Sequence, residues 1–173
     1  NKNEFFCLYS VDAGQKWIDK TKVFIPEHLN NFIEFCVSSV SIDQSRDILC
    51  HKYDNLPNIV PDFIYVDGPD PSTIDGSMHG QSWKDVDRPV VSVDLLNFES
   101  TLLPGTFVLI DGRTLNARFL AANLSRHWVI ENNFINDITA MEIHELPLGD
   151  RNAQRLKYQL GPDVLNWPDP IKL

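Results

Sequence analysis

The chain has 173 residues, of which 43% are hydrophobic and 23% charged, a composition typical of a folded globular protein rather than a disordered one. Its formal net charge is −9 and its lysines and arginines form no cluster, so we expect no binding to nucleic acid. No apolar run approaches the roughly 18 residues of a membrane-spanning helix, and no secretory signal is visible, so we expect no membrane association.

The first third of the chain predicts strands and helices in alternation. Residues 4–11 form an apolar and aromatic run typical of a strand buried on both faces. Residues 15–25 carry apolar side chains at helical spacing and predict a helix that ends at a proline. A second strand is expected over residues 31–41, a helix or irregular segment over 43–53, and a proline-bounded connection over 55–61.

The middle of the chain predicts two more strands around a long loop. Residues 62–66 predict a short buried strand, and residues 70–88 are polar and predict a loop of a length that often serves as a functional lid. Apolar positions at helical spacing predict a helix over residues 89–103, which the Pro-Gly pair that follows would end. Residues 106–110 predict the next buried strand.

The last third predicts a helix, two strands and a tail. Residues 116–125 read as a helix and 128–130 as a short strand, whereas the alternating pattern of 137–146 predicts an antiparallel strand with one exposed face. Residues 149–173 are expected to form a peripheral tail. Strands that alternate with helices predict a parallel sheet with helices on both sides.

Three of the expected strands end in an acidic residue. Asp12, Asp67 and Asp111 each follow an apolar run directly. In open parallel sheets, ligands bind beyond the carboxyl ends of the strands. The three aspartates are therefore the main candidates for a functional site, although each also lies in sequence that forms turns readily.

Three segments resemble class I S-adenosylmethionine-dependent methyltransferases: SVDAGQKW at residues 10–17, PDFIYVDGPDP at 61–71 and LLPGTFVLIDGRTLNARFL at 102–120. They resemble the second strand of that fold, the fourth strand with its substrate-side loop, and the fifth strand after a Pro-Gly turn. The runs at 128–130 and 138–146 resemble the final two strands, one of them antiparallel. The resemblance covers residues 4–147, and IDGRTLNARFL is also similar to a subgroup of bacterial methyltransferase-like proteins, some thought to belong to surface-polysaccharide gene clusters.

The resemblance implies a Rossmann-like, doubly wound α/β fold, with a mostly parallel sheet, an antiparallel C-terminal strand and three α/β/α layers. It implies S-adenosylmethionine as cofactor, with Asp12 at its ribose and Asp67 facing the methyl group or the acceptor. Ser10 and Gly68 are further cofactor-binding residues. A carboxylate suits the ribose because it accepts hydrogen bonds from both hydroxyls of a vicinal diol. Asp67 and Asp111 are then the candidate catalytic residues.

The sequence departs from the family at its beginning. The family's first strand and glycine-rich turn should lie before SVDAG, but Gly14 is isolated and no GxGxxG run occurs. We therefore expect a further strand and this turn to precede Asn1. In this interpretation residues 1–148 are a methyltransferase-like domain that is incomplete at its N-terminus, and residues 149–173 are the peripheral C-terminal tail.

Four further residues are candidates for substrate binding. Arg113 follows Asp111 and could bind a carboxylate or phosphate of the substrate together with Asn116; alternatively, Arg113 pairs with an acid and Asn116 caps the helix. In the long loop, Trp83 could stack on a sugar or another ring, and His79 could contact the substrate or simply be exposed. Two strand-end carboxylates could also hold a divalent cation, but a neighbouring arginine would neutralise one of them, so we expect no metal.

The expected function is methyl transfer from S-adenosylmethionine to an oxygen or nitrogen of a small, sugar-like acceptor. Two alternatives remain open: a non-catalytic Rossmann-like module with an assembly or regulatory role, and, more weakly, a nicotinamide-dependent enzyme. Cys7, Cys36 and Cys50 are odd in number and lack CxxC spacing, which indicates free, mostly buried thiols and a cytoplasmic protein. The formation of a homodimer is left open.

Overall fold

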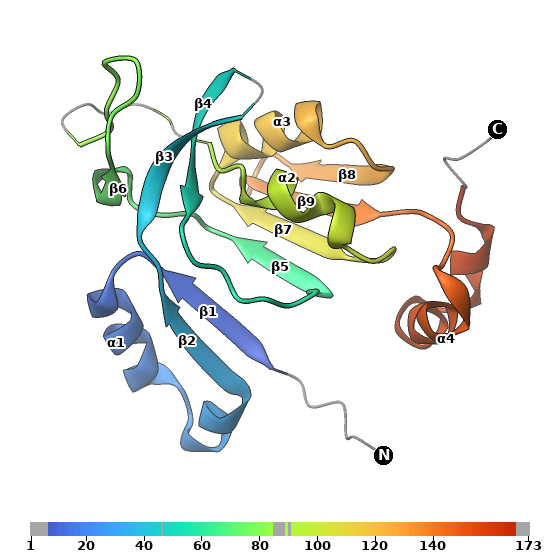
Figure 1. The fold of residues 1–173 in the computed structure, drawn as a ribbon. Helices are drawn as coiled ribbons and strands as arrows, with labels where there is room; N and C mark the ends of the chain where they lie inside the picture. The colour runs from blue at the N-terminus through green and yellow to red at the C-terminus, as the bar shows by residue number, and fades with distance from the viewer. Residues whose placement is uncertain (1–6, 46, 85–88, 90, 169–173) are drawn as a thin grey trace. The chain divides into compact units, whose positions relative to one another are not determined.

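The computed structural model describes residues 7–45, 47–84, 89 and 91–168, and these residues form two compact units (Figure 1). Unit 1 comprises residues 1–58 and 69–90, and unit 2 comprises residues 59–68 and 91–173. The parts of the expected segments that fall on residues 4–6, 46, 85–88, 90 and 169–173 lie outside the described residues.

Unit 1 contains two small sheets. β1 (Leu8–Asp12) pairs in parallel with β2 (Ile33–Val37), and α1 (Gln15–Phe24) connects them, followed by a 3-10 helix over Glu27–Phe32. In the second sheet, β3 (Val40–Ser45) lies between β4 (Ile48–Tyr53), which is antiparallel to it, and the short β6 (Ile74–Asp75), which is parallel. The buried cluster of this unit consists of Val40, Ile74 and Trp83.

The expected elements over residues 15–53 are confirmed only in part. The helix over residues 15–25 is confirmed as α1, but the strand expected over residues 31–41 is split, because Ser38 and Ser39 separate β2 from β3. The helical or irregular segment expected over 43–53 is wrong. Residues 43–45 and 48–53 belong to the antiparallel pair β3–β4, since two strands separated by only two residues can pair only in antiparallel fashion.

Unit 2 contains one four-stranded sheet with the order β5-β7-β9-β8. β5 (Phe63–Val66) is parallel to β7 (Phe107–Asp111), and β9 (Ile138–Ile143) is antiparallel to both β7 and β8 (Trp128–Asn133). The expected antiparallel strand near the C-terminal end is therefore confirmed. Its burial alternates residue by residue, as the period-two pattern predicts.

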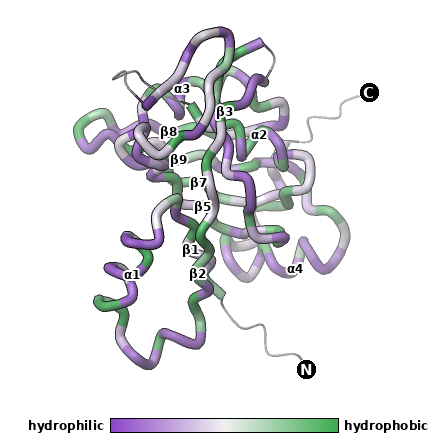
Figure 2. The backbone as a smooth tube through the Cα atoms, turned by 60° about the vertical axis from the view of Figure 1, so that its left-hand side comes forward, coloured by the Kyte–Doolittle hydropathy of each residue, from purple (hydrophilic) through white to green (hydrophobic). Residues whose placement is uncertain are grey.

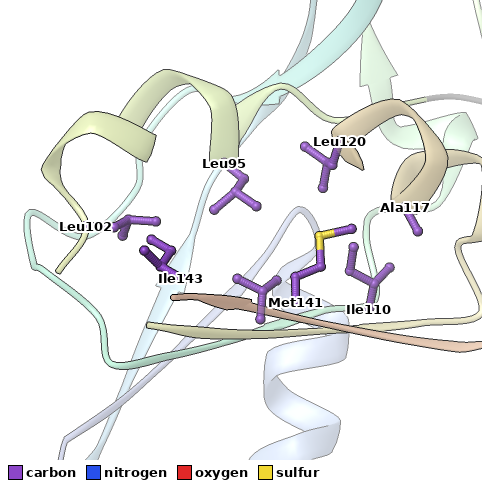
Figure 3. Packing of buried hydrophobic residues seen from close by; sticks show 8 residues of the cluster. Leu95, Leu102, Ile110, Ala117, Leu120, Met141 and Ile143 are labelled. Carbon is purple, nitrogen blue, oxygen red and sulfur yellow. The ribbon is translucent and has the colours of Figure 1, made fainter. Parts of the chain in front are cut away.

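Three α-helices complete unit 2. α2 (Asp94–Phe98) continues into a 3-10 helix over Glu99–Thr101, and α3 (Thr114–Asn123) follows β7. Leu95 of α2 and Ala117 and Leu120 of α3 point towards Ile110 and Met141 on the strands, as Figure 3 shows. α4 (Gly149–Leu160) lies beyond β9, and a last 3-10 helix covers Pro162–Asn166.

The sheet of unit 2 has two different faces. Ile64, Val66, Val108, Ile110, Met141 and Ile143 belong to the hydrophobic core cluster or pack against it. The opposite face carries the alternate positions of the same strands. Phe63 and Tyr65 on that face are 53% and 52% exposed, so β5 is not the buried strand expected over residues 62–66.

The expected fold class is wrong. Instead of a mostly parallel, three-layered Rossmann-like sheet, the described residues form small sheets of two, three and four strands, and the larger two are mixed. Parallel pairing is limited to β1–β2, β3–β6 and β5–β7 in the part of the chain that the structure describes. The hairpin β3–β4 has a short connection, which forces antiparallel pairing where a helix or irregular segment was expected, whereas the antiparallel pair β8–β9 agrees with the expectation.

Candidate functional site

The strand ends of β5 and β7 bring two of the expected acids to one edge of the unit 2 sheet. Val66 is in register with Ile110, so Asp67 and Asp111, each one residue further along, follow neighbouring parallel strands. Asp67 is exposed and Asp111 is half-buried. The expectation that these two acids lie on neighbouring strands is confirmed.

Tyr65 also belongs to this edge, and the sequence interpretation missed it. Its hydroxyl donates a hydrogen bond of 2.5 Å to Oδ2 of Asp111. The pKa of Tyr65 lies above its ordinary value, first because the phenolic proton is held by Asp111, then because of partial burial and the negative charges of Asp111 and Asp67. The alternation of Phe63 and Tyr65 with Ile64 and Val66 is the signal that could have revealed an exposed aromatic face.

Arg113 closes the loop that follows β5. Its Nε donates to the carbonyl oxygen of Asp67, and its Nη2 donates to the carbonyl oxygen of Gly68 at 3.3 Å. A Cβ added at Gly68 would lie 3.3 Å from Nε of Arg113, so a glycine lets the guanidinium approach the backbone. In these bonds Arg113 contacts the peptide backbone rather than an acidic side chain, and it fixes the loop next to Asp67.

Asn116 is buried and hydrogen-bonded within unit 2, as a residue with a structural role would be. It is 5% exposed, and its Oδ1 accepts a hydrogen bond of 2.7 Å from the backbone N–H of Ser92. It lies inside the first turn of α3, whose N-cap is Arg113, so Asn116 does not cap the helix. Asn116 joins α3 to the segment that leads into α2.

The other two candidate substrate contacts belong to unit 1. Trp83 is 4% exposed, packs with Val40 and Ile74, and its indole N–H donates to the carbonyl oxygen of Pro89 at 3.4 Å. His79 is exposed, and its Nε2 lies 3.1 Å from Oε1 of Gln44. The structure thus places Trp83 in the core of unit 1 and leaves His79 at its surface.

Asp12 ends β1, as expected, and forms a turn there. Its Oδ1 accepts a hydrogen bond of 2.7 Å from the N–H of Gly14, and its carbonyl oxygen accepts one of 3.0 Å from Ser38. Ser10 and Asp12 are both half-buried. Oδ1 therefore takes part in the turn, and the carboxylate stays partly accessible at the strand end, which fits a contact to a ribose diol. The glycine-rich turn that would approach the rest of the cofactor is not supplied by the printed sequence.

The remaining site chemistry is limited in the part of the chain that the structure describes. No group of three or more His, Cys, Asp or Glu side chains is placed there to hold a metal ion. Cys7 is exposed, Cys36 is half-buried and Cys50 is buried, and all three are free thiols, so only one is as buried as expected. None of the helices in the described ranges is both long and apolar enough to cross a membrane.

Comparison of the chain with protein-family models, with curated proteins and with solved structures found no match.

Proposed function

We propose that this protein transfers a methyl group from S-adenosylmethionine to an oxygen or nitrogen of a small, sugar-like acceptor. The observation that carries the proposal is the pair of acids, Asp67 and Asp111, at the carboxyl ends of two adjacent parallel strands. This is the position at which α/β sheets bind ligands. The segments that contain both acids are also those that resemble the methyltransferases.

The residues of unit 2 supply the acceptor chemistry in this proposal. When bound, S-adenosylmethionine supplies a methyl group activated by its sulfonium, so the protein mainly has to align the acceptor and remove its proton. Asp67 is exposed and takes that proton as general base. Asp111, oriented by the Tyr65 hydroxyl, accepts a hydrogen bond from the substrate that receives the methyl group. Arg113 holds the loop that contains Asp67 in place.

The assignment of the ribose contact to Asp12 comes from the resemblance of residues 10–17 to the second strand of the methyltransferases. The Asp12 carboxylate at the end of β1 binds the ribose hydroxyls, with Ser10 on the same strand beside it. Asp12→Asn removes a charged hydrogen-bond acceptor. We therefore expect this variant to bind S-adenosylhomocysteine about tenfold or more weakly than the parent protein. Isothermal titration calorimetry on the full-length protein measures this directly.

The matched control is Asp19→Asn in α1, an exposed acid whose Oδ1 accepts a hydrogen bond from Gln15. We expect this variant to bind S-adenosylhomocysteine like the parent protein. Absence of binding by the parent, or equal affinities of the two variants, would contradict the proposal. Absence of binding would instead favour a non-catalytic module with an assembly or regulatory role.

The proposal also covers the cellular compartment of the protein, which we infer from its cysteines. Three free thiols, Cys7, Cys36 and Cys50, fit a reducing environment, so we place the protein in the cytoplasm.

A further inference from the structure

α1 has an exposed side that carries both apolar and basic residues. Nine of its ten residues are exposed, and only Ile18 is buried. With 3.6 residues per turn, Lys16, Trp17, Lys20, Val23 and Phe24 lie together on the side of the helix opposite Ile18. Val23 and Phe24 are 80% and 84% exposed. Figure 2 shows the apolar and hydrophilic stretches that follow one another along α1.

This exposed side requires an explanation because a helix of this length has little stability of its own. Helices shorter than about 12 residues are marginal in water, and they are normally stabilised by packing of an apolar stripe. α1 packs one side chain, Ile18, and leaves a larger apolar stripe in solvent. Contiguous exposed apolar surface of this kind marks interaction sites.

The second face of the unit 2 sheet is apolar and acidic. We call it the open face and define it by two rows of residues in register: Phe63, Phe107, Glu142 and Val129, and Tyr65, Leu109, Ala140 and Glu131. Phe63 and Phe107 stack with their ring centroids 5.9 Å apart. Neither row contains a lysine or an arginine, and Glu131 is exposed. The open face therefore offers aromatic surface bordered by negative charge.

We propose that α1 of one chain lies across the open face of a second copy, and that two such contacts join a two-fold symmetric dimer. The lysines of α1 then face the exposed Glu131, since Glu142 is paired with His144. Trp17, Val23 and Phe24 cover the aromatic rings of the open face. The length of α1 matches the width of the sheet, since ten helical residues span about 15 Å and four strands span about 14 Å. This inference is independent of the proposed methyl transfer.

The proposed dimer contains the contact between α1 and the open face twice. The footprint of one helix of this length is small compared with the roughly 1,200–2,000 Å² that specific interfaces bury. A two-fold axis forms the contact twice, because the same two surfaces of each chain meet their counterparts on the other chain. The charge complementarity between α1 and the open face matters here, because two chains of net charge −9 otherwise repel each other.

Analytical ultracentrifugation of the whole chain over a range of concentrations, at physiological salt, tests the proposal. We expect a monomer–dimer equilibrium that Lys20→Glu and Glu131→Lys each weaken by about tenfold or more, because each puts like charges opposite one another. The control Lys157→Glu reverses an exposed lysine of α4 and should leave the equilibrium unchanged. Circular dichroism establishes that each variant is folded.

The decisive sample is an equimolar mixture of the two single variants. In a mixed dimer, the glutamate introduced into α1 of one chain faces the lysine introduced into the open face of the other. The second contact pairs the unchanged Lys20 with the unchanged Glu131, so both contacts are complementary again. We expect the mixture, and the double variant alone, to recover dimers. A parent chain that stays monomeric at all concentrations, a dimer insensitive to both reversals, or a mixture that stays monomeric would each overturn the proposal.

Discussion

Glu99 is a buried carboxylate that joins the helices of unit 2 to β8. It accepts hydrogen bonds from the backbone N–H groups of Ser125 and Arg126, from the Ser125 hydroxyl and from the indole N–H of Trp128, at 2.9–3.2 Å. Burial alone would raise the pKa of Glu99, but the hydrogen bonds from Arg126, Trp128 and Ser125 together outweigh it, so the pKa lies below its ordinary value. The charged carboxylate therefore stabilises the fold.

We expect Glu99→Gln to lower the free energy of unfolding by about 1–3 kcal/mol at neutral pH, the usual contribution of hydrogen bonds to a charged group. A depressed pKa in the folded state gives stability that is present above the unfolded pKa, about 4.3 for Glu, and lost as the pH falls through the folded pKa. The difference between the parent and the variant should therefore shrink below about pH 4.

Urea unfolding followed by circular dichroism at several pH values measures this difference. The exposed Asp163 provides the control, because Asp163→Asn removes a carboxylate charge from the same unit without a buried hydrogen-bond network. A destabilisation by Glu99→Gln that does not change between neutral and acidic pH would show that the charge of Glu99 does not contribute.

At the scale of elements, α4 is fitted to the turn before β7. Leu156, which is fully buried, lies against Gly105, and a Cβ added at Gly105 would clash with Cδ2 of Leu156. Gly105 also has φ +82°, a conformation that other residues rarely adopt. The Nη2 of Arg155 donates to the carbonyl oxygen of Pro104 at 2.9 Å, and Arg155 forms an ion pair with Asp62. Residues beyond 148 thus contribute buried side chains to unit 2.

We expect Gly105→Ala to destabilise the protein by about 1–3 kcal/mol through the clash and the backbone strain. Leu156→Ala should cost about 2–5 kcal/mol because it leaves a cavity. The double variant should be more stable than the sum of the two effects implies, since the cavity accommodates the new methyl group. A double-mutant cycle measured by urea unfolding gives this coupling.

A substitution at Gly112 distinguishes the backbone strain from the clash with Leu156 as causes of the destabilisation by Gly105→Ala. Gly112 also has a positive φ, +63°, but an added Cβ there would meet no atom within 4 Å. Gly112→Ala should therefore show the backbone strain alone and no coupling to Leu156→Ala. Equal coupling at both glycines would contradict a direct contact between Gly105 and Leu156.

Local sequence patterns predicted those elements whose signals are complete within a short window. α1, α3, β7 and β9 each lie close to their expected positions, because apolar periodicity or alternation and a turn residue mark them. The segment over residues 43–53 was ambiguous, since Ile48, Leu49 and Tyr53 fit one side of a helix as well as they fit a strand. Pairing with β3, in which Tyr53 is in register with Val40, decides the outcome.

The candidate site also contains residues that the sequence could predict and residues that it could not. The acids at the ends of β5 and β7 were predictable, because apolar runs that end in Asp mark strand ends. The roles of Asn116 and Trp83 were not, since their burial results from packing against Ser92 and against Val40 and Ile74, which are distant in sequence. Tyr65 was missed because its apolar run predicts a buried strand, whereas Phe63 and Tyr65 on one face of β5 are exposed.

At the scale of the whole molecule, the two units differ in the size of their cores. Eight buried hydrophobic residues form the cluster of unit 2, compared with three in unit 1, among the residues that the structure describes. The sheets of unit 1 have two and three strands, and small sheets with little packing are marginally stable. Because burial of apolar surface is the main favourable term in folding, unit 2 should be the more stable unit.

Hydrogen exchange followed by mass spectrometry measures the stability of each unit without changing the sequence. We expect backbone amides of β7 and β9 to be protected at least about tenfold more strongly than those of β3 and β4, because they open only when the larger core unfolds. Similar protection in both pairs of strands would mean that the chain unfolds as one cooperative structure, which contradicts the prediction.

Core substitutions in each unit provide the matched comparison. Met141→Ala truncates a fully buried side chain of unit 2, and Val40→Ala truncates one of unit 1. The first should lower the protection of β7 and β9 and leave β3 and β4 unchanged, whereas the second should do the reverse. The larger deletion should have the larger effect, about 2–5 kcal/mol for methionine. Because the chain passes between the units three times, after residues 58, 68 and 90, such independence would show that stability follows the two cores rather than the continuity of the chain.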